Sequence, residues 1–142
     1  MFDVSHIHPM LVHFPIALLC FGFFLELCYL VRRKYICLTA AGLYLLLGGT
    51  LATVLTVLSG FFFTGEMSGA AGAVREIHET FAVATAVVAL LASGLRLYLA
   101  RKKVEKSPLM TVAFLLYGLA VLGVMGAGFY GGTLVYNHMM PL

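Results

Sequence analysis

The sequence predicts an all-α membrane protein, a four-helix transmembrane bundle with both termini on the extracytoplasmic side. Hydrophobic residues make up 62% of the 142 residues and charged residues only 11%, whereas about a quarter of the residues of a soluble domain are charged. The apolar residues fall into four runs, each long enough to cross about 30 Å of hydrocarbon. The basic residues gather in short clusters beside these runs, a pattern that indicates membrane topology and not nucleic-acid binding.

The four spans are predicted to form a single domain over residues 1–142. They cover about residues 9–31, 36–63, 78–100 and 109–136. Pro108 directly precedes the last span, where its missing N–H costs nothing. A polar, glycine-rich connection, TGEMSGAAGAVREIHE, separates the second span from the third.

The distribution of Lys and Arg predicts the orientation of the spans. Of the nine basic residues, only Arg75 lies outside the two connections that follow the first and third spans, or their immediate flanks. The positive-inside rule assigns these two connections to the cytoplasm. We therefore expect a multi-pass protein of the bacterial inner membrane, with the N-terminus and the C-terminus outside.

All five histidines fall at the predicted outer ends of the spans. They are His6, His8, His13, His78 and His138. A histidine inside the apolar layer is costly and usually has a function. The clustering therefore points to a site at the outer face.

The start of the first span restricts what its histidines can do. Pro15 should kink the helix, because it cannot donate to the carbonyl of Leu11. His8 and His13 are five residues apart, about 140° around a helix axis, which disfavours a metal clamp built by these two alone. An internal hydrogen bond, for example to the carbonyl freed by Pro15, is the alternative for a buried His13.

Small residues recur in the third and fourth spans. Below His78 they form one strip, and in the fourth span they form small-xxx-small pairs such as Gly123 with Ala127 and Gly128 with Gly132. Close helix packing explains such pairs. Small side chains would equally leave room for a flat macrocycle between helices. The match of residues 126–131 to G-x-G-x-x-G is not a dinucleotide site, since no strand precedes it.

Three further charged residues have two interpretations each. Arg75, three residues before His78, either pairs with a nearby glutamate or holds an anionic group such as a haem propionate. Glu26 and Arg96 lie in the inner halves of the first and third spans, where they either pair or extend separately toward the interface. Glu26 is also a candidate for proton movement.

The run HPMLVHFPIAL, residues 8–18, resembles the H-P-x-x-V-H-F-P-I-x-L signature of a bacterial family of small four-span membrane proteins, domain of unknown function 2231. His78 and the run GFYGGTLVY, residues 128–136, resemble later parts of the same pattern. Relatives of this kind are joined to Rieske or c-type cytochrome domains, which implies redox work at the outer face. This chain has no C-x-x-C-H for covalent haem.

The leading hypothesis is a membrane b-type cytochrome that binds haem b noncovalently. Haem iron accepts imidazole from opposite sides, so two histidines on facing helices can hold it. His13 and His78 form the preferred pair, and His8 or His138 is the substitute. Electrons would pass between an extracytoplasmic redox protein and quinone or another carrier in the lipid bilayer.

The second hypothesis is a copper-binding or zinc-binding protein, or a transporter of either metal. Imidazole and thioether ligands suit copper(I), and the outer side offers His6, His8, Met10, His13, Met67, His138, Met139 and Met140. Zinc would combine histidines such as His78 with a glutamate, and the nearby ones are Glu66, Glu76 and Glu79. The third hypothesis is a structural subunit without a cofactor, and the glycine-rich fourth span would also suit a homo-oligomer.

Overall fold

The computed structural model describes residues 7–104 and 107–138, which contain five helices and no strand. The helices are Ile7–Leu11 (α1), His13–Val31 (α2), Ile36–Phe63 (α3), Gly69–Arg101 (α4) and Pro108–His138 (α5). Four segments are long and apolar enough to cross a membrane: Ile7–Val31, which joins α1 and α2, and the three other helices. The predicted all-α bundle of four spans is therefore confirmed, and contact with the lipid bilayer follows from it. The outward orientation of the termini stays a prediction.

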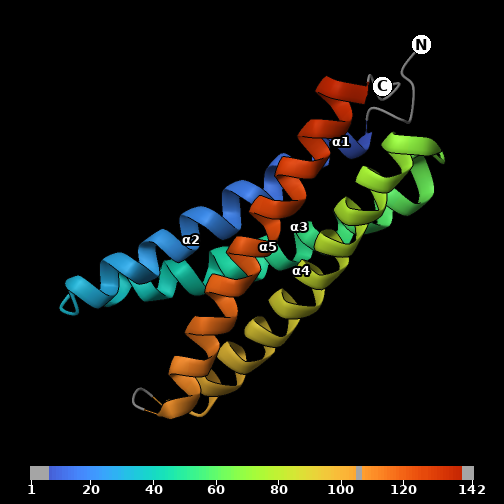
Figure 1. Cartoon of the computed structure of the whole chain (residues 1–142). Helices are drawn as coiled ribbons and strands as arrows, with labels where there is room; N and C mark the ends of the chain where they lie inside the picture. Colours follow the sequence, from blue (N-terminus) through green and yellow to red (C-terminus); the bar gives the residue numbers. More distant parts are fainter. Residues whose placement is uncertain (1–6, 105–106, 139–142) are drawn as a thin grey trace.

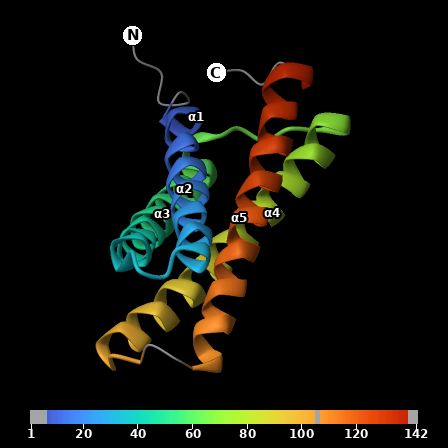
Figure 2. The ribbon, with the colours of Figure 1, turned by 90° about the vertical axis from the view of Figure 1, so that its left-hand side faces the viewer.

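The helices form two antiparallel hairpins that cross each other. The first hairpin pairs α2 with α3, and the second pairs α4 with α5 (Figure 1). The short helix α1 packs on α3 and belongs to the first hairpin. The ends of the hairpins that carry the basic connections diverge in both views, while α1 lies toward the C-terminal half of α5 (Figures 1 and 2). The space between the hairpins at the histidine end is the place for a site.

Helix α4 begins earlier than the predicted third span. The predicted span starts at His78, but the helix starts at Gly69, directly after the extended residue Ser68. Gly69 has a φ of 66°, in the left-handed region that glycine adopts most readily. The residues between Gly69 and His78 were expected to be a connection because they are polar and glycine-rich. They form a helical extension instead, which places His78 more than two turns inside α4.

The close approach of α4 to α5 explains part of the glycine pattern. A Cβ atom on Gly126 would lie 2.7 Å from the ring of Phe81, and one on Gly123 would collide with the hydroxyl of Thr85. These two glycines allow helix packing. Others face different neighbours: the corresponding atom on Gly128 would lie 3.2 Å from Ile16 of α2, so the same helix also approaches the first hairpin.

Glu26 and Arg96 form a buried ion pair between the hairpins. Arg96 Nη2 lies 2.5 Å from Glu26 Oε1, and the hydroxyl of Thr39 lies 3.1 Å from each carboxylate oxygen. Arg96 Nη2 also donates to the Thr39 hydroxyl at 2.9 Å. Of the two interpretations, pairing is therefore the one that the structure shows. The pair joins α2 and α3 to α4 in the half of the bundle that lies toward the basic connections.

Candidate functional site

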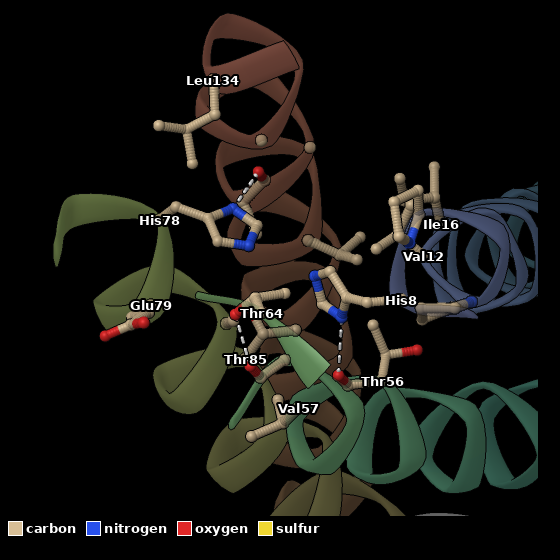
Figure 3. Close-up of a pocket in the computed structure, with 18 of the residues that line it drawn as sticks. His8, Val12, Ile16, Thr56, Val57, Thr64, His78, Glu79, Thr85 and Leu134 are labelled. Atoms are coloured by element: carbon tan, nitrogen blue, oxygen red, sulfur yellow. Dashed lines mark hydrogen bonds between the residues drawn. The ribbon is translucent and has the colours of Figure 1, made fainter. Parts of the chain in front are cut away.

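A cavity of about 320 Å³ lies between the two hairpins at the histidine end, and residues of all five helices line it. Figure 3 shows a view into it. Most of the lining is apolar, with side chains such as Ile16, Val57 and Leu134. Its polar groups are few, and the two imidazole rings of His8 and His78 are prominent among them. An apolar cavity with a few convergent polar groups is typical of a ligand site.

His8 is fixed to its own hairpin. Its Nδ1 lies 3.1 Å from the carbonyl oxygen of Thr56 and 2.9 Å from the hydroxyl oxygen of Ser59. A carbonyl oxygen can only accept, so Nδ1 carries the proton. The Ser59 hydroxyl itself donates to Thr56 O at 2.7 Å, which leaves its oxygen to accept from His8. The absence of a side chain at Gly60 leaves room for the ring, since a Cβ there would lie 3.1 Å from His8 Cε1.

His78 is fixed to the second hairpin in the same way. Its Nδ1 donates to the carbonyl oxygen of Ala127 at 2.8 Å. A Cβ on Gly131, one turn further along α5, would lie 3.1 Å from His78 Cε1. A carbonyl acceptor again fixes the proton on Nδ1, so that in the neutral ring Nε2 has a free lone pair.

The two rings face each other across the cavity. Their centres are 6.2 Å apart and their planes make an angle of 86°. Figure 3 shows the nitrogen of each ring that is not tied to a carbonyl pointing toward the other ring. Among the described residues, neither Nε2 forms a hydrogen bond. Each ring therefore presents a nitrogen without a hydrogen-bond partner to the cavity, an arrangement that an electron-pair acceptor between the neutral rings would stabilise.

The structure pairs His78 with His8 and not with His13, the partner that the sequence favoured. His13 is exposed and lies at the edge of the cavity, with its helix beginning at that residue. The carbonyl of Leu11, proposed as a partner for His13, instead accepts from the hydroxyl of Thr56 at 3.4 Å. His138 ends α5 and is not among the lining residues. His6, Met139 and Met140 lie outside the described residues.

Arg75 and Glu79 lie beside the cavity on α4. Arg75 Nε donates to Glu79 Oε1 at 2.7 Å, and its Nη1 donates to the carbonyl oxygen of Gly65 at 2.7 Å. The predicted pairing with a glutamate is thus present. An arginine has five N–H donors, so donors remain for an anionic group in the cavity.

Sequence reasoning did not identify the acceptors that orient the rings. Ser59 and the carbonyl of Thr56 belong to α3, and the carbonyl of Ala127 belongs to α5. The backbone acceptors have no sequence signal. The hydroxyl residues of α3, which recur at every third position from Thr50 to Ser59, were the available signal.

The described residues contain no group of three or more His, Cys, Asp or Glu side chains placed to hold a metal ion. The site thus offers two imidazole nitrogens from facing hairpins, not a set of three or four protein ligands.

The fold and the site together define a four-span membrane protein with a paired-histidine cavity at one end of the bundle. Residues 5–141 match the model of the family described as Predicted membrane protein (DUF2231), and the chain belongs to that family. No curated protein and no solved structure matches it.

Proposed function

We propose that the protein is a membrane b-type cytochrome in which His8 and His78 are the axial ligands of haem b. This keeps the function that the sequence favoured and exchanges one ligand. Bound haem exchanges single electrons, and the side chains of this protein would hold it, orient it and exclude water from it.

The separation of the two rings carries the proposal. With metal–nitrogen distances of about 2 Å, two imidazoles on opposite sides of one ion have ring centres roughly 6 Å apart. The observed 6.2 Å agrees. Both Nδ1 atoms donate to carbonyl oxygens, which is the support that ligating histidines usually have. The ring separation and the two Nδ1 contacts therefore support the proposal that the pair binds one metal centre.

The number of ligands favours haem over a bare ion. A structural zinc ion takes four ligands, whereas the porphyrin supplies four equatorial nitrogens and leaves two axial positions for the protein. The cavity volume of about 320 Å³ lies at the lower limit of small-molecule pockets, about 300–1,000 Å³, so the two hairpins would have to move apart to admit a whole porphyrin. A single ion would not need that space. Copper(I) bound by the same two rings is the alternative outcome of the test.

The surroundings of the cavity are consistent with this ligand. Arg75 has spare donors beside the cavity, where a propionate of the haem would be neutralised. We further propose that the histidine end faces outward in the bacterial inner membrane, because the basic connections lie at the other end. An extracytoplasmic redox protein and quinone are then the expected partners, and a homo-oligomer remains compatible with the exposed helix faces.

Absorbance of the purified protein tests the proposal. After expression in haem-replete cells, the protein should show a Soret band that shifts on reduction with dithionite. His8→Ala and His78→Ala should each remove most of this band. His138→Ala is the matched control and should keep it, and His13→Ala should keep it as well.

Metal analysis of the same samples separates the alternatives. A colourless protein with stoichiometric copper would favour the copper site. Loss of copper in both His8→Ala and His78→Ala would then identify the same two ligands. Full haem content in His8→Ala, together with loss in His13→Ala, would instead restore the pair favoured by the sequence.

A further inference from the structure

A second polar site lies around the buried Glu26–Arg96 pair. Tyr117 of α5 is 2% exposed, and its hydroxyl has no hydrogen-bond partner among the described residues. A Cβ atom on Gly22 would collide with this hydroxyl. Gly22 is one helical turn before Glu26 on the same face of α2. The Tyr117 hydroxyl therefore lies about one turn from the carboxylate.

An unpaired hydroxyl at this depth requires an explanation. Leaving a buried polar atom without a partner costs about 1–3 kcal/mol, and the explanations for such an atom are strain, a catalytic role, or a bound water or ion. Glu26 can supply the second partner of such a water. The single proton of the Thr39 hydroxyl is shared between both carboxylate oxygens, so lone pairs on the carboxylate remain available. An unpartnered hydroxyl thus lies near an ionisable group that still has free acceptor sites.

A series of buried hydroxyls connects this site with the histidine cavity. Thr53 lines the cavity. One turn below it, the hydroxyls of Thr50 and Ser93 lie 2.8 Å apart. Ser93 is three residues before Arg96, which is about one turn of α4. We call Thr53, Thr50 and Ser93 the hydroxyl seam. Successive polar groups from the cavity to Arg96 are therefore about one helical turn apart.

Hydrogen bonds between helices account for Thr50, which bonds to Ser93 and to the carbonyl of Ala89 in α4, but they do not account for Thr53. The hydroxyl of Thr53 donates to Gly49 O in its own helix at 2.7 Å, so it joins no second helix. A valine would fill the same volume without a polar atom. Buried ionisable residues inside a membrane protein usually belong to an ion pathway or a proton relay.

We propose that the hydroxyl seam, the Tyr117 hydroxyl and Glu26 form a proton path through the bundle. Each hydroxyl or water oxygen accepts a proton on a lone pair and passes its own proton on. The Glu26 carboxylate becomes a carboxylic acid, and it then returns the proton to water on the side of the basic connections. Arg96 keeps its charge, and no electron is transferred. The path does not depend on what the cavity binds.

Proton flux into vesicles tests the path. The purified full-length protein is reconstituted into phosphatidylcholine vesicles that contain a pH-sensitive dye, and a potassium diffusion potential drives protons inward. Vesicles with the wild-type protein should acidify faster than protein-free vesicles. Tyr117→Phe and Thr50→Val should each slow the flux by about tenfold, because each removes one hydrogen bond from the moving proton. Glu26→Gln should reduce it to the rate of protein-free vesicles.

Two matched control variants each remove a hydroxyl that lies outside the proposed path. Tyr98→Phe removes the hydroxyl of an exposed tyrosine, and Thr80→Val removes a hydroxyl that donates only to Glu76 O on the exposed side of α4. Both controls should conduct like the wild type. If Glu26→Gln does not fold, Tyr117→Phe and Thr50→Val decide the question. Wild-type flux in these folded variants, or no flux above protein-free vesicles in the wild type, would overturn the proposal. Haem content, measured separately, tests the histidine cavity alone.

Discussion

The hydroxyl of Thr56 donates to the carbonyl oxygen of Leu11 at 3.4 Å. Within its own helix that carbonyl would receive the amide of residue 15, but residue 15 is proline and has none. The carbonyl oxygen of Thr56 also accepts a hydrogen bond from His8 Nδ1. Thr56 therefore satisfies the carbonyl that Pro15 leaves unpaired. It also orients the ring of His8, which lies seven residues before that proline.

Thr56→Val should lower the unfolding free energy by about 1 kcal/mol, because it leaves the Leu11 carbonyl without a partner. In a Pro15→Ala background the same substitution should cost clearly less, since the backbone N–H gained at position 15 then satisfies that carbonyl. Unfolding in mixed detergent micelles measures both values. If Thr56→Val lowers the unfolding free energy equally in both backgrounds, Thr56 does not stabilise the protein through the Leu11 carbonyl.

The perpendicular rings predict a specific magnetic signature for the haem-loaded protein. If His8 and His78 held haem iron and kept the 86° between their rings, the two iron orbitals that they interact with would be almost equal in energy. The oxidised protein should therefore give the strongly anisotropic low-spin electron paramagnetic resonance signal of crossed imidazoles. A rhombic low-spin signal would mean that the rings become parallel on binding, and a high-spin signal would mean that one ring is not a ligand.

Gly60→Ala and Gly131→Ala should each weaken haem binding by about tenfold, which corresponds to about 1.4 kcal/mol. Each new methyl group would lie 3.1 Å from the Cε1 atom of an adjacent ring, so the ring must move away from its carbonyl. Titration of the haem-free variants with haemin measures the affinity. Gly94→Ala is the control, because a Cβ atom there meets open space, and it should bind haem like the wild type.

The buried ion pair should matter far more for stability than the outer one. Glu26→Ala leaves the Arg96 charge buried without its partner and should lower the unfolding free energy by about 3 kcal/mol or more. Glu79→Ala breaks the Arg75 pair, whose side chains are 18% and 38% exposed, and should cost no more than about 1 kcal/mol.

A double substitution tests the cause of this difference. Replacing Glu26 and Arg96 together by leucine should recover much of the loss, because no unpaired charge then remains in the bundle. Unfolding in mixed detergent micelles again supplies the values. A double variant as unstable as Glu26→Ala alone would contradict this explanation.

The sequence by itself determined the four apolar segments, the family and the grouping of the histidines at one end. The four segments follow from composition and from the lengths of the apolar runs, because a chain crossing the hydrocarbon core must satisfy its own backbone hydrogen bonds. The family was indicated by the motif at residues 8–18, and the grouping of the histidines by their positions at the ends of these segments. The sequence also identified His78, Arg75 and the two buried charges, since an ionisable residue in an apolar run is conspicuous.

Only the tertiary structure decided which groups meet. It placed His8 opposite His78, left His13 exposed at the edge of the cavity, and joined Glu26 to Arg96 rather than leaving them apart. These outcomes depend on the crossing of two hairpins and on backbone carbonyls at Thr56 and Ala127. Every residue has a carbonyl, so the ones that orient a ring are selected only when helices distant in sequence pack together.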